Sequence, residues 1–162
     1  MNKGKKILGL GLLAVTGFGV YYAGRQVYVF KNMQTSIVNA NPRNISNTNI
    51  DVDATIRFTN NSAMNLYISK LDLEIIVAGG RVGTINEVYE PNVLIPKNGQ
   101  GDIDVTFNFN PMSALGGSVL SLLDNAISGD AFNILLKGNI SGGNKIIKLA
   151  NHKFEDTIKI LG

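Results

Sequence analysis

Hydrophobic and polar residues alternate with a period of two along several stretches after residue 50. Residues 50–59 alternate without a break, and residues 103–109 repeat the pattern. Such alternation predicts half-buried β-strands with one apolar face. We expect these two strands to contribute the following side chains to one core: Ile50, Val52, Ile56, Phe58, Val105, Phe107 and Phe109.

The same pattern predicts further strands at residues 66–77, 81–85, 93–95, 132–140, 145–149 and 154–160. Gly79-Gly80 fits a hairpin turn. Residues 26–38 are expected to be extended, with the alternative that the segment begins as more helix. Residues 39–49 are expected to form a loop because they contain Pro42 and many asparagines. Residues 113–127 carry apolar residues at helical spacing. About seven strands with one short helix and no βαβ alternation predict a mainly β, antiparallel sandwich.

The N-terminus has a different pattern. Residues 7–24 contain no charge, follow the basic residues Lys3, Lys5 and Lys6, and precede Arg25. About 18 residues form a helix of roughly 27 Å, close to the ~30 Å hydrocarbon core of a bilayer. We therefore expect residues 1–31 to be a basic N-terminus with a single transmembrane helix, and residues 32–162 to be the β domain.

Two alternatives to a retained anchor remain. The run could be a signal peptide, although cleavage after Ala23 would place Tyr21 where a small residue is preferred. It could also be a buried core helix. Positive charge is denser before the run than after it, although Arg25 and Lys31 act against that difference. The N-terminus is thus expected in the cytoplasm and the β domain on the opposite side of the membrane.

Small residues gather on one face of the expected anchor, namely Gly9, Thr16, Gly19 and Ala23. Such a face lets a second helix approach closely, which predicts homo- or hetero-oligomers formed through the anchor. The alternative is that small residues are simply common in membrane helices. Residues 9–14 also fit G-x-G-x-x-A, but no acidic residue precedes Asp51 and no strand precedes the run, so we expect no nucleotide cofactor.

Charge and cysteine content limit the function classes. Residues 1–50 hold six basic and no acidic side chains, whereas the remainder holds nine basic and twelve acidic ones. The β domain is therefore net acidic, which argues against nucleic acid as a partner. The chain has no cysteine, which excludes disulfides and thiolate metal sites.

Two pairs of aspartates are the only acidic residues whose spacing indicates a metal-binding or catalytic site. The pairs are Asp51 with Asp53, and Asp102 with Asp104. Each pair points to one side of a strand, so neighbouring strands could join them into a weak Ca²⁺ site or an acid–base pair. The alternative, which we prefer, is a solvated strand face. His152, the single histidine, is expected in an exposed loop. We predict no catalytic residue, no cofactor and no required metal.

The chain resembles the type 2 late-embryogenesis-abundant (LEA) proteins, which include the water-stress and hypersensitive-response (WHy) domain. The resemblance rests on residues 56–62 as a strand and Asn-rich turn, residues 66–73 leading to Gly79-Gly80, and residues 97–99 before the alternating strand. Residues 113–125 and 133–138 match the family's short helix and late strand. Asn61 stands where the family usually has proline. The resemblance implies a seven-stranded immunoglobulin-like or fibronectin-III-like sandwich without catalytic residues.

These observations predict a membrane-anchored, non-enzymatic interaction or structural domain, with protection as one form of that role. The lipid bilayer is its expected partner, together with an unidentified protein. The alternative is a structural membrane protein of a larger assembly, such as a lipid-containing virion, that links membrane to shell. A hydrolase or ligand-binding enzyme is the third hypothesis.

Overall fold

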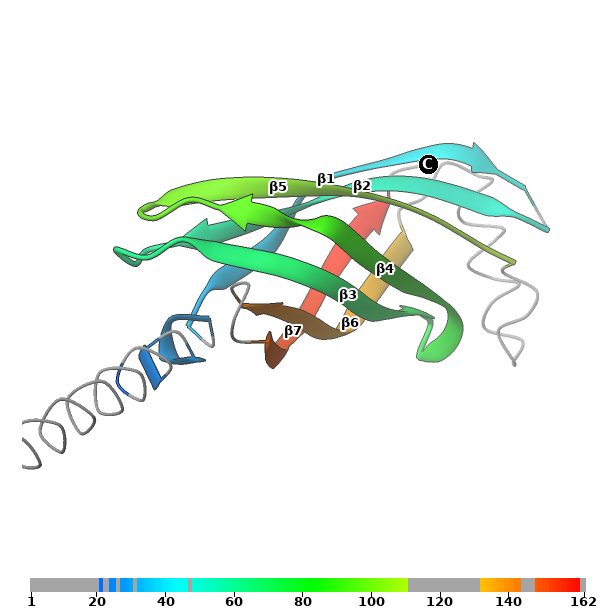
Figure 1. Ribbon diagram of the computed structural model, residues 1–162. Coiled ribbons are helices and arrows are strands. Elements are labelled where there is room, and N and C mark those ends of the chain that lie inside the picture. Colours follow the sequence, from blue (N-terminus) through cyan, green and yellow to red (C-terminus); the bar gives the residue numbers. More distant parts are fainter. Residues whose placement is uncertain are drawn as a thin grey trace, which may run out of the picture.

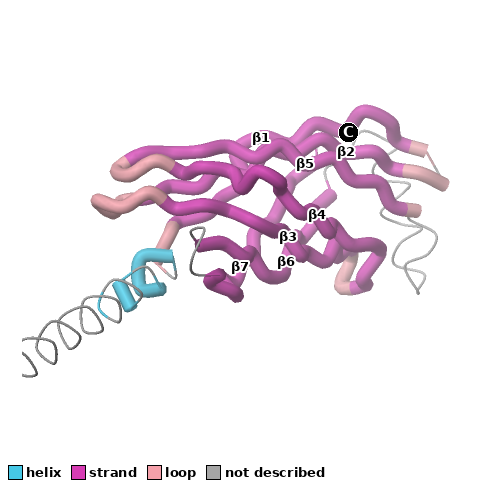
Figure 2. Tube along the Cα trace, viewed as in Figure 1, coloured by secondary structure: helices cyan, strands magenta, loops and turns pink. Residues whose placement is uncertain are grey.

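The computed structural model describes residues 21, 24–25, 27–30, 32–46, 48–110, 132–143 and 148–160, which form seven strands preceded by a helix (Figures 1 and 2). The strands are β1 (Gln34–Ile45), β2 (Ile50–Asn60), β3 (Leu66–Val77), β4 (Gly80–Ile95), β5 (Gly99–Phe109), β6 (Phe132–Gly143) and β7 (Lys148–Ile160). They form a three-stranded sheet in the order β1-β2-β5 and a four-stranded sheet in the order β4-β3-β6-β7. All the pairings are antiparallel, as expected for a mainly β chain.

The core lies between the two sheets. Strand β2 alternates between buried and half-buried positions along its whole length, and β5 alternates between buried and exposed from Asp102 onward. All seven side chains expected in the core from the sequence are 5% exposed or less. They share the core with the inward residues of β3, which include Leu71, Leu73, Ile75 and Val77.

Residues 39–49 are not the loop that the sequence predicts, because β1 extends through most of them. β1 is an edge strand, so it tolerates a proline that cannot donate to a ladder. Its register with β2 shifts at two places, between Ile37 and Asn39 and between Pro42 and Asn44. These irregularities explain why the segment lacks the alternation that marks its neighbour β2.

Other predicted boundaries also need correction. Residues 27–30 are helical, which is the alternative left open for the start of the segment at residues 26–38. The strands expected at residues 81–85 and 93–95 are one strand, β4, and those at 145–149 and 154–160 are one strand, β7. The β3–β4 turn falls at Ala78 and Gly79, one residue earlier than expected, with φ angles of 52° and 80°. Such left-handed angles suit a tight hairpin turn.

The helix adjoins one end of the sandwich, beside the β2–β3 loop, and the β4–β5 loop lies at the same end (Figure 1). Among the described residues, no helix has the length and hydropathy needed to cross a membrane. The expected anchor at residues 7–24 lies outside the described residues except for Tyr21 and Gly24. The same holds for the expected helix at residues 113–127 and for the packing face of Gly9, Thr16, Gly19 and Ala23.

Candidate functional site

The outer face of the three-stranded sheet carries the two predicted aspartate pairs on neighbouring strands. In the register of β2 and β5, Asp53 lies opposite Thr106, and Asp104 lies opposite Thr55. Asp51 lies opposite Asn108, and Asp102 opposite Arg57. The antiparallel register therefore sets each carboxylate across from a neutral or basic side chain.

Each of these carboxylates has a donor in the surrounding strands. Thr55 Oγ1 donates to Asp104 at 2.7 Å, and Thr106 Oγ1 donates to Asp53 at 2.7 Å. Arg43 forms an ion pair with Asp53 at 2.9 Å, and Asn49 Nδ2 donates to Asp51 at 2.8 Å. Within the described ranges, no group of three or more histidine, cysteine, aspartate or glutamate side chains is arranged to hold a metal ion.

Arg57 binds Asp102 through both ends of its guanidinium. Nε donates to Oδ1 at 2.8 Å, and Nη2 donates to Oδ2 at 2.7 Å. These hydrogen bonds, helped by the charge of Arg57, hold the pKa of the Asp102 carboxyl below its usual range and raise the pKa of Arg57. Because both side chains are solvent-exposed, the pair orders the face more than it stabilises the fold.

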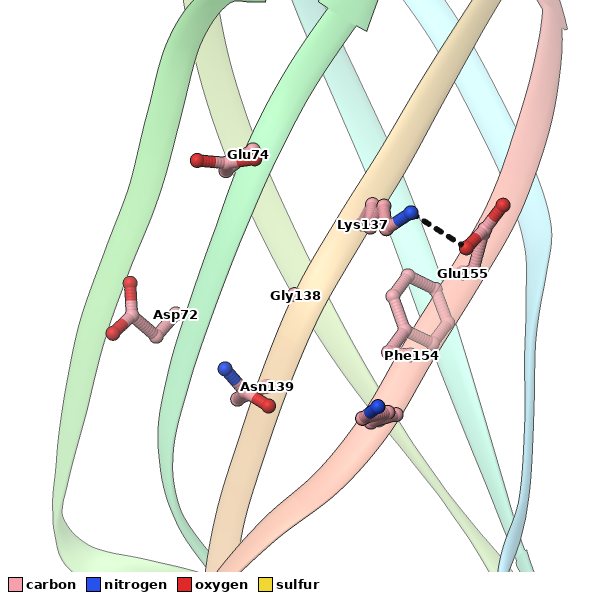
Figure 3. Close-up of a pocket in the computed structure, with 8 residues that line it drawn as sticks. Asp72, Glu74, Lys137, Gly138, Asn139, Phe154 and Glu155 are labelled. Carbon is pink, nitrogen blue, oxygen red and sulfur yellow. Dashed lines mark ion pairs between the residues drawn. The ribbon is translucent and has the colours of Figure 1, made fainter.

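The outer face of the four-stranded sheet holds a shallow hollow of about 510 Å³ (Figure 3). Side chains of β3, β6 and β7 surround Gly138 at its floor: Asp72, Glu74, Lys137, Asn139, Lys153 and Glu155. Lys137 pairs with Glu155 at 3.3 Å, as Figure 3 shows, and Arg81 pairs with Glu74 at 3.1 Å. The walls of the hollow thus mix both signs of charge, which suits hydrated polar contacts.

Gly138 lies where the backbones of β6 and β3 come close together. A Cβ atom at this position would overlap the carbonyl oxygen of Asp72 and approach the Cα of Leu73 at 2.8 Å. The backbones of β6 and β3 are therefore too close for any side chain at Gly138. The glycine inside the apolar pattern of residues 132–140 is the only sequence signal that marks this place.

A third region lies where the helix meets the sheets. Phe30 and Met33 are 1% and 4% exposed and belong to the core. The Phe30 ring packs at Gly142 and contacts His152 edge-on, with centroids 6.0 Å apart and an interplanar angle of 81°. His152 is thus a half-buried residue of β7 rather than the exposed loop residue expected, and its Nε2 lies 3.4 Å from Thr35 Oγ1.

Asn60 organises the loops beside this junction. Its side chain is buried, and its Nδ2 donates to the carbonyl oxygens of Met64 at 2.8 Å and Pro96 at 3.0 Å. Its Oδ1 accepts hydrogen bonds from the backbone N and Oγ of Ser62. Asn98 N donates to Ser62 O at 2.8 Å, so the β2–β3 and β4–β5 loops form one unit.

Comparison with known proteins supports the fold. No family model matches the sequence, and no curated protein matches it. A protein from Arabidopsis thaliana, known from its solution structure, is 12% identical with a TM-score of 0.52, covering 79% of this chain and 80% of that chain. A putative LEA protein is 10% identical with a TM-score of 0.50, covering 99% of this chain and 91% of that chain.

A protein from Archaeoglobus fulgidus is 12% identical with a TM-score of 0.49, covering 81% of this chain and 98% of that chain. The two likenesses with TM-scores of 0.52 and 0.50, at 12% and 10% identity, show the fold alone. The chain is therefore a β-sandwich with structural neighbours that include an LEA-like protein.

Proposed function

We propose that this chain is a type 2 LEA-like sandwich of the fibronectin-III or immunoglobulin kind, held at a membrane by its N-terminal helix and acting by contact rather than by catalysis. The observation that carries the proposal is the junction at Phe30. The described helix residues end with Phe30, whose side chain lies inside the sandwich core. In the sequence, the apolar run leads directly into this helix, so the proposal extends the anchor from it.

The arrangement of charges supports a binding or structural role. The predicted aspartates are engaged by Arg57, Thr55, Arg43, Thr106 and Asn49. At Asp102 the hydrogen bonds from Arg57 lower the pKa of the carboxyl, which makes this group a poor general acid or base near neutral pH. Both outer faces present mixed polar surfaces, which suit contact with water and with polar partners.

The same architecture supports the alternative, a membrane protein that links a bilayer to the shell of a larger assembly such as a virion. A helix whose last aromatic side chain packs into the domain core suits such a link, because it limits movement of the domain relative to the membrane. Purification of the intact particle or complex separates the two roles. A fixed stoichiometry with one assembly favours the structural link, whereas a variable and dispersed membrane association favours the general interaction role.

Membrane anchoring is tested with the full chain and one charged substitution. Leu13→Arg places a charge in the middle of the apolar run, which costs about 2.5–3.5 kcal/mol on insertion scales. We expect the unmodified chain and the control Leu13→Ile to stay in the membrane fraction after an alkaline wash, with an intact mass that includes the run. We expect Leu13→Arg to be released. Retention of all three, or a mature start near Gly24 in soluble protein, would contradict the proposal.

A further inference from the structure

The Phe30 side chain belongs to the helix and to the sandwich core at the same time. It is 1% exposed, although Tyr28 on the same turn is 69% exposed. The helix therefore turns one aromatic residue into the protein and leaves another in solvent. A flexible tether would leave its side chains in solvent, whereas here a complete phenylalanine ring is buried.

Two strands of the four-stranded sheet, β6 and β7, contact the ring. A Cβ atom at Gly142 of β6 would overlap both the Phe30 ring and the carbonyl oxygen of Tyr67 on β3. His152 of β7 contacts the ring edge-on. The absence of a side chain at Gly142 thus creates the space that Phe30 fills, and the ring is held from several directions.

The connection between helix and sheet is also short and ordered. Asn32 N donates to the carbonyl oxygens of Tyr28 and Val29 at 3.2 Å, and Met33 N donates to that of Phe30 at 3.3 Å. The Asn32 side chain adds a hydrogen bond of 2.7 Å to Tyr28 O. Met33 is buried in turn, and β1 begins at the next residue. On both sides of residue 31, the described residues between the helix and the first strand are thus hydrogen-bonded or buried.

We propose that the helix ending at Phe30 and the two sheets move as one rigid body, and that the Phe30 side chain fixes their relative orientation. A buried residue on each side of a two-residue connection removes the swivelling that a flexible linker allows. The helix then determines which loops of the sandwich face the membrane that anchors it under the proposed function. These are the β2–β3 and β4–β5 loops, which lie at the helix end (Figure 1). This rigid connection belongs to the chain itself, so it is expected in detergent as well as in a bilayer.

The absence of cysteine makes the test direct, since paired cysteines can be introduced for spin labels. One pair is Gly24→Cys with Asn108→Cys, which reports the distance from the helix to the far end of β5. A Cβ at Gly24 meets no atom within 4 Å, and Asn108 is exposed. The reference pair is Lys159→Cys with Asn108→Cys, both within the sandwich. Pulsed electron paramagnetic resonance on the full chain in detergent gives the distance distribution of each pair.

We expect one narrow helix-to-sandwich distribution in the unmodified background and in the control Tyr28→Ala. We expect Phe30→Ala to give a broad helix-to-sandwich distribution, while the distance distribution of the reference pair stays narrow. A broad distribution in the unmodified background overturns the proposal, as does a narrow one in Phe30→Ala with an intact reference pair. If Phe30→Ala also broadens the reference pair, Phe30→Leu, which keeps part of the apolar volume, takes its place and the same comparison decides.

Discussion

At the scale of single residues, Asn60 shows how one polar side chain can hold two loops together. Its amide supplies donors to carbonyl oxygens of both the β2–β3 loop and the segment after β4, and it is 1% exposed. The sequence shows only an Asn-rich turn, Asn60-Asn61-Ser62, and gives no sign that the first asparagine is buried while the second is exposed. The difference arises because Asn60 continues the inward face of β2.

Replacing Asn60 with alanine is expected to destabilise the fold by about 1–3 kcal/mol, because buried carbonyl groups lose their donors. Denaturant unfolding measures this loss. The control Asn61→Ala removes an exposed side chain and should remain within about 0.5 kcal/mol of the unmodified protein. Equal effects at the two positions would show that the buried amide has no special role.

The pair of Arg57 and Asp102 gives a second prediction at this scale. Because the guanidinium donates to both carboxylate oxygens, the pKa of Asp102 is lowered in the folded state. The pair therefore favours folding at pH values above the pKa of the unfolded aspartate. This contribution disappears as the pH falls through the lower folded pKa.

Carboxyl carbon chemical shifts followed during an acid titration measure this pKa directly. Arg57→Gln should raise the pKa of Asp102 toward the ordinary range. Arg43→Gln, which removes the ion pair of Asp53 instead, should leave Asp102 unchanged. A change in the pKa of Asp102 in Arg43→Gln would mean that the charges on this face act together over a distance rather than as separate pairs.

At the scale of elements, the ease of prediction follows the regularity of each strand. β2, β3, β5 and β6 each bury one face and expose the other, so alternation identifies them. β1 and β4 are edge strands with register shifts. Parts of β1 carry Asn and Pro residues, and parts of β4 carry Asn, Pro and Glu residues, which are typical of loops. Local pattern cannot show that such segments pair, because pairing depends on the regular neighbour.

The predicted acidic site illustrates a related limit. Alternation correctly places Asp51 with Asp53, and Asp102 with Asp104, on the solvent side of their strands. The partners of these carboxylates depend on the register between β2 and β5, which neither strand encodes by itself. The hollow above Gly138 and the contact of Phe30 with Gly142 likewise join segments that are distant in sequence.

The register of β2 and β5 predicts that calcium leaves the fold unaffected. The carboxylates already accept hydrogen bonds from strand neighbours, so an added ion gains little. A strong site would stabilise the fold by about 2.7 kcal/mol at a hundredfold excess over its dissociation constant. Thermal melting with calcium and then with chelator should give the same midpoint. A rise of several degrees that is lost in Asp53→Asn with Asp104→Asn would contradict this prediction.

Gly138→Ala tests the close approach of β6 to β3. The added methyl group meets backbone atoms rather than a flexible side chain, so we expect a loss near the upper end of the 1–3 kcal/mol range typical of overpacking. Gly83→Ala on β4 is the matched control. Its Cβ would lie 3.2 Å from Ile75 Cδ1, the mobile end of a side chain. Similar unfolding midpoints for the two variants would show that β6 can move away from β3.

At the scale of the whole molecule, the two sheets enclose one continuous core that also includes Phe30 and Met33 before β1. The edges of the sheets are linked as well. The backbone N of Ile37, at a register shift in β1, donates to Asp156 Oδ2 on β7 at 2.7 Å. A carboxylate that occupies an edge amide reduces the tendency of that edge to pair with another chain.

Phe107 provides the test of the shared core, because it projects from β5 toward the opposite sheet and is 5% exposed. Phe107→Ala should destabilise the molecule by about 3–5 kcal/mol, as is typical for a truncated buried phenylalanine. Asn108→Ala, on the exposed side of the same strand, should have little effect. A melting temperature that does not change in Phe107→Ala would place this ring outside the core.

The union of the helix with β1 has a mechanical consequence. β1 and β7 run in the same direction, so the helix joins β1 at one end of the sandwich while Ile160 lies at the other. Tension between the helix and Ile160 therefore acts along β1 and slides it past β2. The hydrogen bonds between these strands lie across that direction, so they bear the load together rather than breaking one after another. Such shear geometry lets a small, cysteine-free domain resist being pulled apart.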